Sequence, residues 1–338
     1  MTVPVNLPAL QINKAHSLFF KHKGYTIVEL MVVLVVSLFL VGGILSVFVA
    51  TKALTKETIS ASARQENAAY ALQALSRDLK QSYFFAEASG ENNGLWLSPP
   101  AILAKDDCLD NKNMGTFPSG AGSFRALWAA VKESGAEPTM SCIKDTAPST
   151  ELISESDYIS IKRARGLYQT GNYQEDRYYL SISPSGITVI PGNATAGKEK
   201  LWEYIHHVYY LDSEAGVPRL LRMKLELGKM GDAEVIAEGI EKMKFMFALD
   251  KALEAARDGS AHDFVNSAAV TDADWNDGRV IGVKIFLLVR SKEEAAGVHD
   301  TATYQLGDYD HTVTGDGYKR EVVSRTLMFT NNTRFSDD

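Results

Sequence analysis

The pattern of apolar and polar positions in the N-terminal quarter of the chain predicts one long helix with two different halves. The 22 residues from Leu30 to Thr51 are uncharged and rich in Val, Leu, Ile and Phe. At about 1.5 Å per residue they span roughly 33 Å, enough to cross a bilayer core of about 30 Å. From Lys52 to about Glu87 there is no Pro or Gly, and apolar residues recur at helical spacing: Ala68, Leu72, Leu75 and Leu79. We therefore predict a helix from Tyr25 to roughly Ala86, about 90 Å long, transmembrane at first and amphipathic afterwards.

A glycine pair, Gly42-Gly43, lies inside this predicted helix. Because glycine loosens a helix, two helices joined by a hinge at this pair are an alternative. No proline interrupts the segment, so the pair is expected to be its most flexible point.

Downstream, helical spacing gives way to alternation, which predicts strands. Apolar and polar residues alternate in Leu221–Leu227 and in Lys242–Phe247, so both are expected to be half-buried, with Lys242 and Lys244 on the polar side. The run from Val280 to Arg290 is more apolar and is predicted to be a central strand. Further strands are expected at Asp157–Lys162, Arg177–Ser183, Tyr204–Leu211 and Glu321–Phe329.

Polar segments rich in Gly and Asp separate these strands, notably Asp250–Gly278 and Val298–Gly317, and are expected to be loops. A long helix followed by antiparallel strands gives an α+β fold, in which the sheet covers the C-terminal half of the helix. The predicted divisions are a transmembrane part at 25–51, an amphipathic part at 52–86 and a globular α+β domain at 87–338.

A basic leader and one acid flank the apolar run. Residues 1–24 contain three lysines and no acid, and Lys and Arg favour the cytoplasmic side, which places the globular domain outside. A secretory signal peptide is the alternative, but its apolar core would be shorter and would end in a small-residue cleavage site. Glu29 is the lone acid in the run. Because a carboxylate in the bilayer core costs roughly 2.5 to 3.5 kcal/mol, Glu29 is a candidate functional residue.

The residues around Glu29 carry a specific resemblance. Lys23-Gly24, followed by Tyr25-Thr26-Ile27-Val28-Glu29-Leu30 and a long apolar helix, resembles the class III signal of type IV pilins and type II secretion pseudopilins. The resemblance implies that a prepilin peptidase cuts between Gly24 and Tyr25, removing the leader 1–24, and that Tyr25 becomes the N-methylated end. The family usually has Phe at the place of Tyr25.

In such a helix Glu29 lies one turn beyond Tyr25. Its carboxylate can therefore face the positive amino terminus of a neighbouring subunit, and this charge pairing would offset much of its burial cost. A snorkelling glutamate at the membrane interface is the alternative. We expect Glu29 to serve assembly.

Short sequence segments further along the chain narrow the resemblance to PilW-type minor pilins, with the type IV pilin-like fold that this family implies. They are Tyr209-Tyr210-Leu211, Pro218–Arg222, Glu238–Glu241, Trp275, Leu288–Ser291 and Tyr318-Lys319-Arg320. Residues 101–150 match nothing that we can place, so their role stays open.

Composition argues against nucleic acid as a direct partner. The chain has 338 residues, 45% of them hydrophobic, with 35 basic and 42 acidic side chains and a net charge of −7. Removing the leader removes three lysines and no acid, so −7 becomes −10. An acidic domain disfavours phosphate-backbone binding. Lys162, Arg163 and Arg165 form a possible local basic patch, but a solvated strand end is the simpler interpretation.

The chain has two cysteines, Cys108 and Cys142, and the orientation expected from the basic leader places both outside the membrane. Two cysteines in an oxidising compartment usually pair, and closing their loop would contribute roughly 3 to 4 kcal/mol. We predict a disulfide that staples a loop rich in Gly, Pro, Ser, Asn and Asp, with Trp128 near its middle. Metal ligation is a poor alternative, because the sequence has no CxxC and no nearby histidine pair.

Motifs for enzymes or cofactors are weak. Gly192 to Lys198 resembles the start of a phosphate-binding loop, but Glu199 stands where Ser or Thr would hold magnesium, so nucleotide binding is not expected. His206 and His207 are adjacent and point to opposite faces of a strand, so they cannot share one metal. We interpret them as surface or satisfied core histidines.

Acids and an amide crowd one loop at Asp272, Asp274, Asn276 and Asp277, which makes it a weak calcium candidate. Gly278 comes one place late for a calcium loop, and Val283 stands where a bidentate Glu is needed. A solvated turn is the simpler interpretation. We expect no metal, no cofactor and no catalytic residues.

These observations predict a minor pilin, a structural or priming subunit of a type IV pilus that bears on adhesion, twitching motility or DNA uptake. The expected partners are the prepilin peptidase, other minor pilins, the major pilin and inner-membrane lipid. The expected location is the bacterial inner membrane, with the C-terminal domain in the periplasm, and then the filament, at its tip or elsewhere. The alternatives are a minor pseudopilin of type II secretion and, more remotely, a membrane-anchored periplasmic enzyme.

Overall fold

The computed structural model describes residues 24–86, 97–98, 108, 114–117, 124–144, 149–183, 186–195, 197, 200–251 and 259–332. The chain divides into two units, Met1–Lys56 and Glu57–Asp338. Of the predicted leader, only Gly24 lies within the described residues. Lys198 and Glu199 of the phosphate-loop resemblance lie outside them.

One helix, α1 (Ile27–Lys80), accounts for most of the described N-terminal part of the chain. It runs through Gly42-Gly43 without interruption, so the predicted continuous helix is confirmed and the two-helix alternative is wrong for this structure. The helix ends six residues before the predicted Ala86. Residues 81–83 form a turn in which Tyr83 has φ = 61°, a left-handed conformation that α-helices do not continue through.

The C-terminal half of α1 buries one face in the second unit. Its buried apolar residues follow helical spacing: Ala68, Ala71, Leu75 and Leu79. Three of them, Ala68, Leu75 and Leu79, are predicted positions. Leu72 is only partly buried and packs against the same core. Burial of a leucine side chain contributes about 1.5 to 3 kcal/mol, so this face anchors the helix to the sheet.

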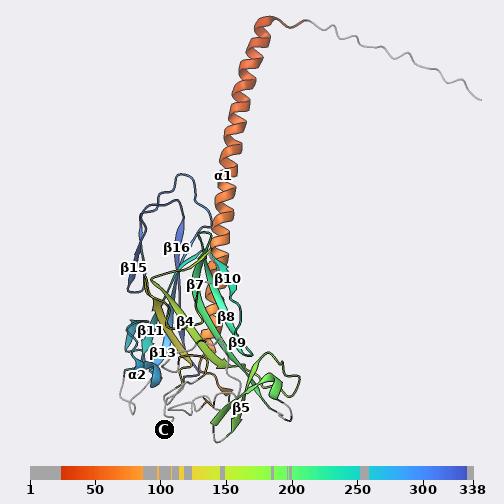
Figure 1. The fold of residues 1–338 in the computed structure, drawn as a ribbon. Helices are drawn as coiled ribbons and strands as arrows, with labels where there is room; N and C mark the ends of the chain where they lie inside the picture. The colour runs from red at the N-terminus through yellow and green to blue at the C-terminus, as the bar shows by residue number, and fades with distance from the viewer. Residues whose placement is uncertain are drawn as a thin grey trace, which may run out of the picture. The chain divides into compact units, whose positions relative to one another are not determined.

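A ten-stranded sheet forms the larger layer of the second unit (Figure 1). Its central path runs β1-β6-β5-β7-β4-β2, and β7 also pairs with β8 and β3. All its pairs are antiparallel except the short pair of β1 with β6. The strands are β1 (Leu97–Ser98), β2 (Leu127–Lys132), β3 (Thr150–Leu152), β4 (Ser156–Ala164), β5 (Tyr178–Ser183), β6 (Gly186–Pro191), β7 (Trp202–Glu214), β8 (Val217–Glu226), β9 (Lys229–Met230) and β10 (Glu234–Glu238).

A second, four-stranded antiparallel sheet has the order β12-β11-β13-β16. Its strands are β11 (Ile240–Leu249), β12 (Asp263–Asn266), β13 (Val280–Arg290) and β16 (Arg320–Met328). β13 has the predicted bounds and the predicted central place. The antiparallel α+β architecture expected from the sequence is therefore confirmed.

Three segments predicted to be loops contain regular structure. The segment 250–278 holds β12 and the short helix α2 (Asp272–Asn276), and 298–317 holds the hairpin of β14 (Thr303–Leu306) and β15 (Tyr309–Thr312). The predicted disulfide loop holds β2, with Trp128 buried in it. These strands are short or flanked by polar residues, so alternation was too brief to reveal them.

Polar side chains join the two sheets where the sequence suggested solvent. Lys242 and Lys244 on β11 are both 8% exposed, so the prediction of a half-buried strand is wrong there. Lys244 Nζ lies 3.1 Å from Asp157 Oδ1 on β4, and the same carboxylate accepts a hydrogen bond from Phe245 N at 2.9 Å. The buried Asp157 carboxylate on the other sheet thus accounts for the inward position of Lys244.

Candidate functional sites on the N-terminal helix

The segment before α1 is extended and exposed. Gly24 and Tyr25 precede the helix, Tyr25 is 82% exposed, and a Cβ at Gly24 would meet nothing within 4 Å. A peptide bond in such a segment is accessible to a protease.

Thr26 begins the helix as its N-cap. Its hydroxyl accepts a hydrogen bond from Glu29 N at 3.2 Å, and its carbonyl accepts one from Leu30 N at 3.1 Å. Glu29 therefore occupies the third helical position, where a carboxylate is favoured by the helix dipole. Thr26 and Glu29 have the spacing of a capping box, a signal of the helix start that is present in the sequence.

The helix then exposes apolar side chains on every side. From Ile27 to Val49 the large apolar side chains are between 52% and 80% exposed. Among the described residues, α1 is the one helix long and apolar enough to cross a membrane. An apolar surface of this extent requires lipid or other helices around it.

The second half of α1 carries a buried acid, Asp78, which is 3% exposed. Its Oδ1 lies 2.9 Å from the Arg163 guanidinium, and its Oδ2 contacts His207 Nδ1 and the Tyr209 hydroxyl, each at 2.5 Å. These partners come from the neighbouring strands β4 and β7. Asp78 therefore fixes the helix to the centre of the larger sheet. We call Asp78, Arg163, His207 and Tyr209 the Asp78 cluster.

The charges in this cluster depend on one another. Burial alone would raise the pKa of Asp78, but the hydrogen bond and charge of His207, with Arg163 and Tyr209, hold it well below its usual range. Burial lowers the pKa of His207 despite the neighbouring carboxylate. Asp78 lies three residues after Leu75 on the buried face, a helical spacing from which its burial could have been inferred.

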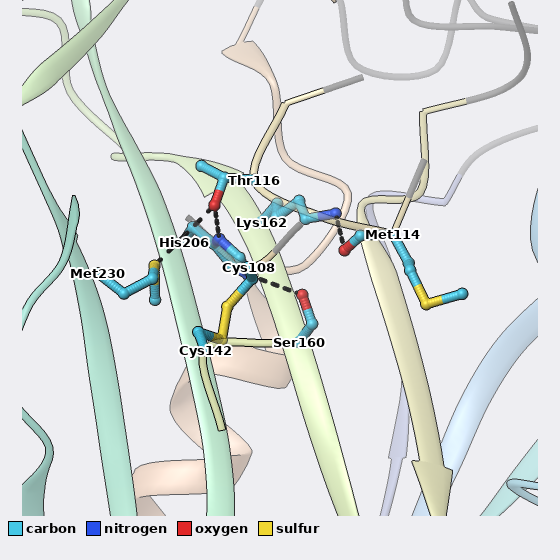
Figure 2. Close-up of a disulfide and its surroundings, with 8 residues drawn as sticks. All are labelled: Cys108, Met114, Thr116, Cys142, Ser160, Lys162, His206 and Met230. Atoms are coloured by element: carbon cyan, nitrogen blue, oxygen red, sulfur yellow. Dashed lines mark hydrogen bonds between the residues drawn. A yellow bond between two sulfur atoms is a disulfide. The ribbon is translucent and has the colours of Figure 1, made fainter. Parts of the chain in front are cut away.

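The two cysteines form the predicted disulfide, and Figure 2 shows its surroundings. The described residues 114–117 lie over β4 and β7. Lys162 Nζ donates to Met114 O at 2.6 Å, and the Tyr204 hydroxyl donates to Thr116 O at 2.7 Å. Part of the region that the sequence left without a role is therefore held by side chains of two central strands.

His206 and Lys162 serve this attachment. His206 is fully buried between Thr116 Oγ1 at 2.9 Å and Ser160 Oγ at 2.8 Å, so the interpretation as a satisfied core histidine is confirmed (Figure 2). Burial lowers its pKa well below the usual value, so the ring is neutral. Lys162 is also fully buried, and Arg163 is paired with Asp78, so the interpretation of these residues as a solvated strand end is wrong. Only Arg165 extends towards solvent, paired with Glu203 at 2.6 Å.

The weak calcium candidates have protein partners. Asp274 and Thr271 form a capping box at the start of α2. Asp272 pairs with Arg125 at 3.2 Å, and Asp277 pairs with Arg279 at 3.2 Å. Within the described ranges, no group of three or more His, Cys, Asp or Glu side chains is placed to hold a metal ion.

Several of the sequence segments that resemble PilW-type minor pilins contact one another in the structure. Gly239 N donates to Pro218 O at 2.7 Å, and Arg290 N donates to Gly239 O at 2.8 Å. Gly239 has φ = +81°, and a Cβ there would lie 2.7 Å from Arg290 O, so both conformation and space require glycine. The Arg290 guanidinium lies 4.0 Å from the centre of the Tyr318 ring.

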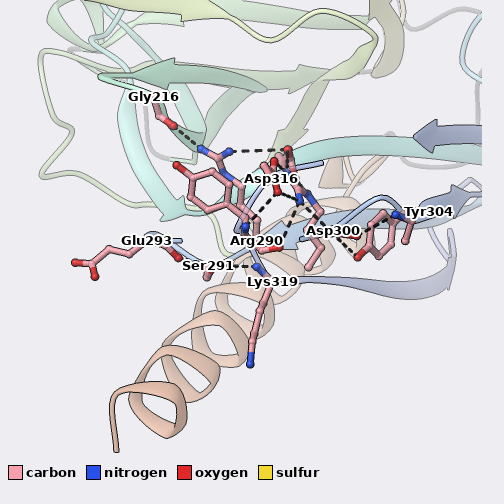
Figure 3. Close-up of polar contacts among 12 residues, drawn as sticks. Gly216, Arg290, Ser291, Glu293, Asp300, Tyr304, Asp316 and Lys319 are labelled. Atoms are coloured by element: carbon pink, nitrogen blue, oxygen red, sulfur yellow. Dashed lines mark hydrogen bonds and ion pairs between the residues drawn. The ribbon is translucent and has the colours of Figure 1, made fainter. Parts of the chain in front are cut away.

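Arg320, from the last of these segments, holds three acids together at the end of the second sheet. Its side chain is 2% exposed and contacts Glu241 at 2.6 Å, Asp300 at 3.0 Å and Asp316 at 2.6 Å. Figure 3 labels Asp300 and Asp316 of this network together with Arg290 and Tyr304, and the Tyr304 hydroxyl donates to Asp300 at 2.8 Å. Widely separated parts of the sequence are therefore fixed to one strand end by charge-assisted hydrogen bonds.

Two family models match the chain, one in each part. The model described as Prokaryotic N-terminal methylation motif matches residues 20–45, which include Gly24, Tyr25 and Glu29. The model described as Type IV Pilus-assembly protein W matches residues 208–331, from within β7 to just beyond β16. No curated protein and no solved structure matches the chain. The two matches, with the exposed apolar helix and the antiparallel domain that follows it in the sequence, support a PilW-like minor pilin of a type IV pilus.

Proposed function

We propose that the chain is cut between Gly24 and Tyr25, is methylated at the new amino terminus, and is held in the inner membrane by the first half of α1 until it enters the pilus. The basic leader supports this orientation, with the second unit in the periplasm. The chain acts by assembly and catalyses no reaction. Its direct partners are the prepilin peptidase and then other minor pilins and the major pilin.

The observation that carries this proposal is the place of Glu29. It is the one charged residue between Tyr25 and Thr51, in a segment whose apolar side chains are exposed on all sides. Apolar contacts between such helices add little drive for association in a membrane, because lipid chains are equally apolar. A charged pair between Glu29 and the amino terminus of a neighbouring subunit supplies the registry that the apolar surface lacks.

The local geometry separates this role from a structural one. It is the backbone N–H of Glu29, and not its side chain, that donates to Thr26. A substitution of the Glu29 side chain therefore keeps the Thr26 cap and the start of the helix. Effects of such a variant on assembly report the carboxylate itself.

The test uses the full chain with Glu29→Ala and Glu29→Gln, expressed with the other pilus subunits. Both variants are expected to insert and to be processed, and both are expected to lose co-purification with the other minor pilins. Glu29→Asp, which keeps the charge, is the matched control and is expected to retain part of the association. Co-purification of Glu29→Gln at the wild-type level would refute the pairing.

A further inference from the structure

A cleft of about 540 Å³ opens beside the Asp78 cluster. The last turns of α1 form one wall, and the other walls come from β4, β7, β8 and the segment before β5. Its volume is within the usual range of binding sites, about 300 to 1,000 Å³. The cleft lies entirely within the second unit.

The charge of the cleft is opposite to that of the protein. Acidic residues outnumber basic ones in the whole chain, 42 to 35. Among the residues that line the cleft, Asp78 and Glu203 are the only acids. Six lining side chains are lysine or arginine: Arg77, Arg163, Arg165, Arg177, Arg222 and Lys224. A local concentration of positive charge on an acidic protein attracts anionic partners.

The acids of the protein do not fully compensate these cations. The Asp78 carboxylate is already shared by three partners, and Arg222 and Lys224 share one carboxylate, that of Glu234. Arg177 is 3.6 Å from the exposed Asp176, and its buried Nε has no hydrogen-bond acceptor among the described residues. Arg77 is exposed and makes no ion pair with any residue that the structure describes. The cleft therefore has capacity for added negative charge.

We propose that this cleft binds the carboxylates of an acidic segment on a neighbouring pilus subunit. The proposal rests on the assembly function proposed above and names a contact surface for it. Tyr70 lies at the edge of the cleft and is 56% exposed, with Gln73 next to it on the same helix face. Arginine and tyrosine dominate the energetic centres of protein interfaces, and the Tyr70 ring gives a peptide apolar contact that a free oxyanion cannot use. A protein segment is therefore favoured over a small ion.

The experiment measures binding of a fluorescent peptide of alternating Glu and Gly residues to the full chain in detergent, with the Gln/Gly peptide beside it. We expect the acidic peptide to bind about tenfold more tightly than the neutral one at low salt, and the difference to shrink as salt rises. Arg77→Glu combined with Arg177→Glu is expected to abolish the preference. Lys80→Glu is the matched control, because Lys80 is exposed on the same helix and does not line the cleft.

The outcomes separate the alternatives. Equal binding of both peptides, or a preference that survives the double reversal, overturns the proposal. Displacement of the acidic peptide by inorganic phosphate at low millimolar concentration would show a site for free oxyanions and would also overturn it. In cells, the double variant is expected to co-purify with other pilus subunits less than Lys80→Glu does. If the double variant loses peptide binding but still supports normal pili, the proposed role of the cleft is overturned and the proposed function stands. If cells that lack the chain form normal pili, the proposed function itself is overturned.

Discussion

The two halves of α1 are continuous in backbone and opposite in their surroundings. From Ile27 to Val49 the large apolar side chains are exposed and no partner within the described chain covers them. From Ala68 to Leu79 the helix buries one apolar face and a charged residue against strands of its own chain. The first half is therefore built for contacts with other molecules, and the second half for contacts within the subunit.

The comparison also shows how one charge serves each half. Asp78 is buried, and three side chains of the same chain satisfy it. In the described structure no side chain forms an ion pair with Glu29. The hydrogen bond between Glu29 and the Thr26 cap uses the Glu29 backbone N–H and not the carboxylate. A carboxylate without an internal partner in an apolar segment points to an external one.

The largest expected effect is the loss of Asp78. Asp78→Ala leaves the Arg163 guanidinium buried without its counter-charge, so the free energy of unfolding of the second unit is expected to fall by about 3 to 5 kcal/mol. Denaturant unfolding of the full chain in detergent, followed by tryptophan fluorescence, measures the loss. The control is Gln73→Ala, at an exposed position five residues earlier on the same helix. A loss of less than 1 kcal/mol, roughly that of a surface pair, would show that the Asp78 cluster does not anchor the helix.

A pair of leucine substitutions tests the two halves directly. Leu75 is 0% exposed and Leu38 is 73% exposed. Leu75→Ala is expected to reduce the free energy of unfolding by about 3 kcal/mol, because it leaves a cavity under the helix. Leu38→Ala is expected to leave that stability unchanged and to weaken association with other subunits instead. Equal losses of stability in the two variants would contradict the division between the halves.

A smaller effect is expected from pH. The folded-state pKa of Asp78 lies below its unfolded value of about 3.9, so its stabilisation is present above that value and is lost as the pH falls through the folded-state pKa. The lowered pKa of His207 adds a loss that begins as the pH falls through its unfolded value of about 6.5. Asp78→Asn is expected to flatten the pH dependence of the free energy of unfolding below pH 4. Above pH 4 the variant is expected to keep the loss of stability that comes from His207. An unchanged slope below pH 4 would assign the acid sensitivity to other carboxylates.

The smallest effect is expected where the second half begins. Glu57 forms an ion pair with Lys319, and both side chains are partly exposed. Solvent and salt screen such a pair, so Glu57→Gln is expected to leave the free energy of unfolding without a resolvable change. A loss of unfolding free energy as large as that from Asp78→Ala would show that the helix is anchored near Glu57, in its middle, and not only at the Asp78 cluster.

The sequence was sufficient for the features that follow a strong period. The helix, its buried face and the central strand β13 were predicted because a long apolar run or a repeated spacing sets each of them. The disulfide was predicted because the chain has only two cysteines. The predictions of the helix, its buried face and β13 depend on local pattern alone, whereas the disulfide prediction depends on the cysteine count and the oxidising compartment.

The polar interior could not be predicted in the same way. Lys162, Lys242 and Lys244 occupy positions that the alternation of apolar and polar residues along a strand assigns to solvent, yet each is buried. Their partners lie from 37 to 88 residues away in the sequence, in Arg125, Asp157 and Ser154. Such pairings depend on the topology of the sheets, which the pattern of single segments does not contain. The partners of Asp78 were missed for the same reason, although its burial follows from the helical spacing.

The most direct test of the account is a zero-length carbodiimide crosslink in assembled filaments or subunit complexes, read by mass spectrometry. We expect an amide between the Glu29 carboxylate and the amino terminus of another subunit, and we expect Glu29→Gln to remove this product while other crosslinks persist. Complexes that contain the chain, and that crosslink elsewhere but never at Glu29, would contradict the claim that the first half of α1 is completed by another subunit.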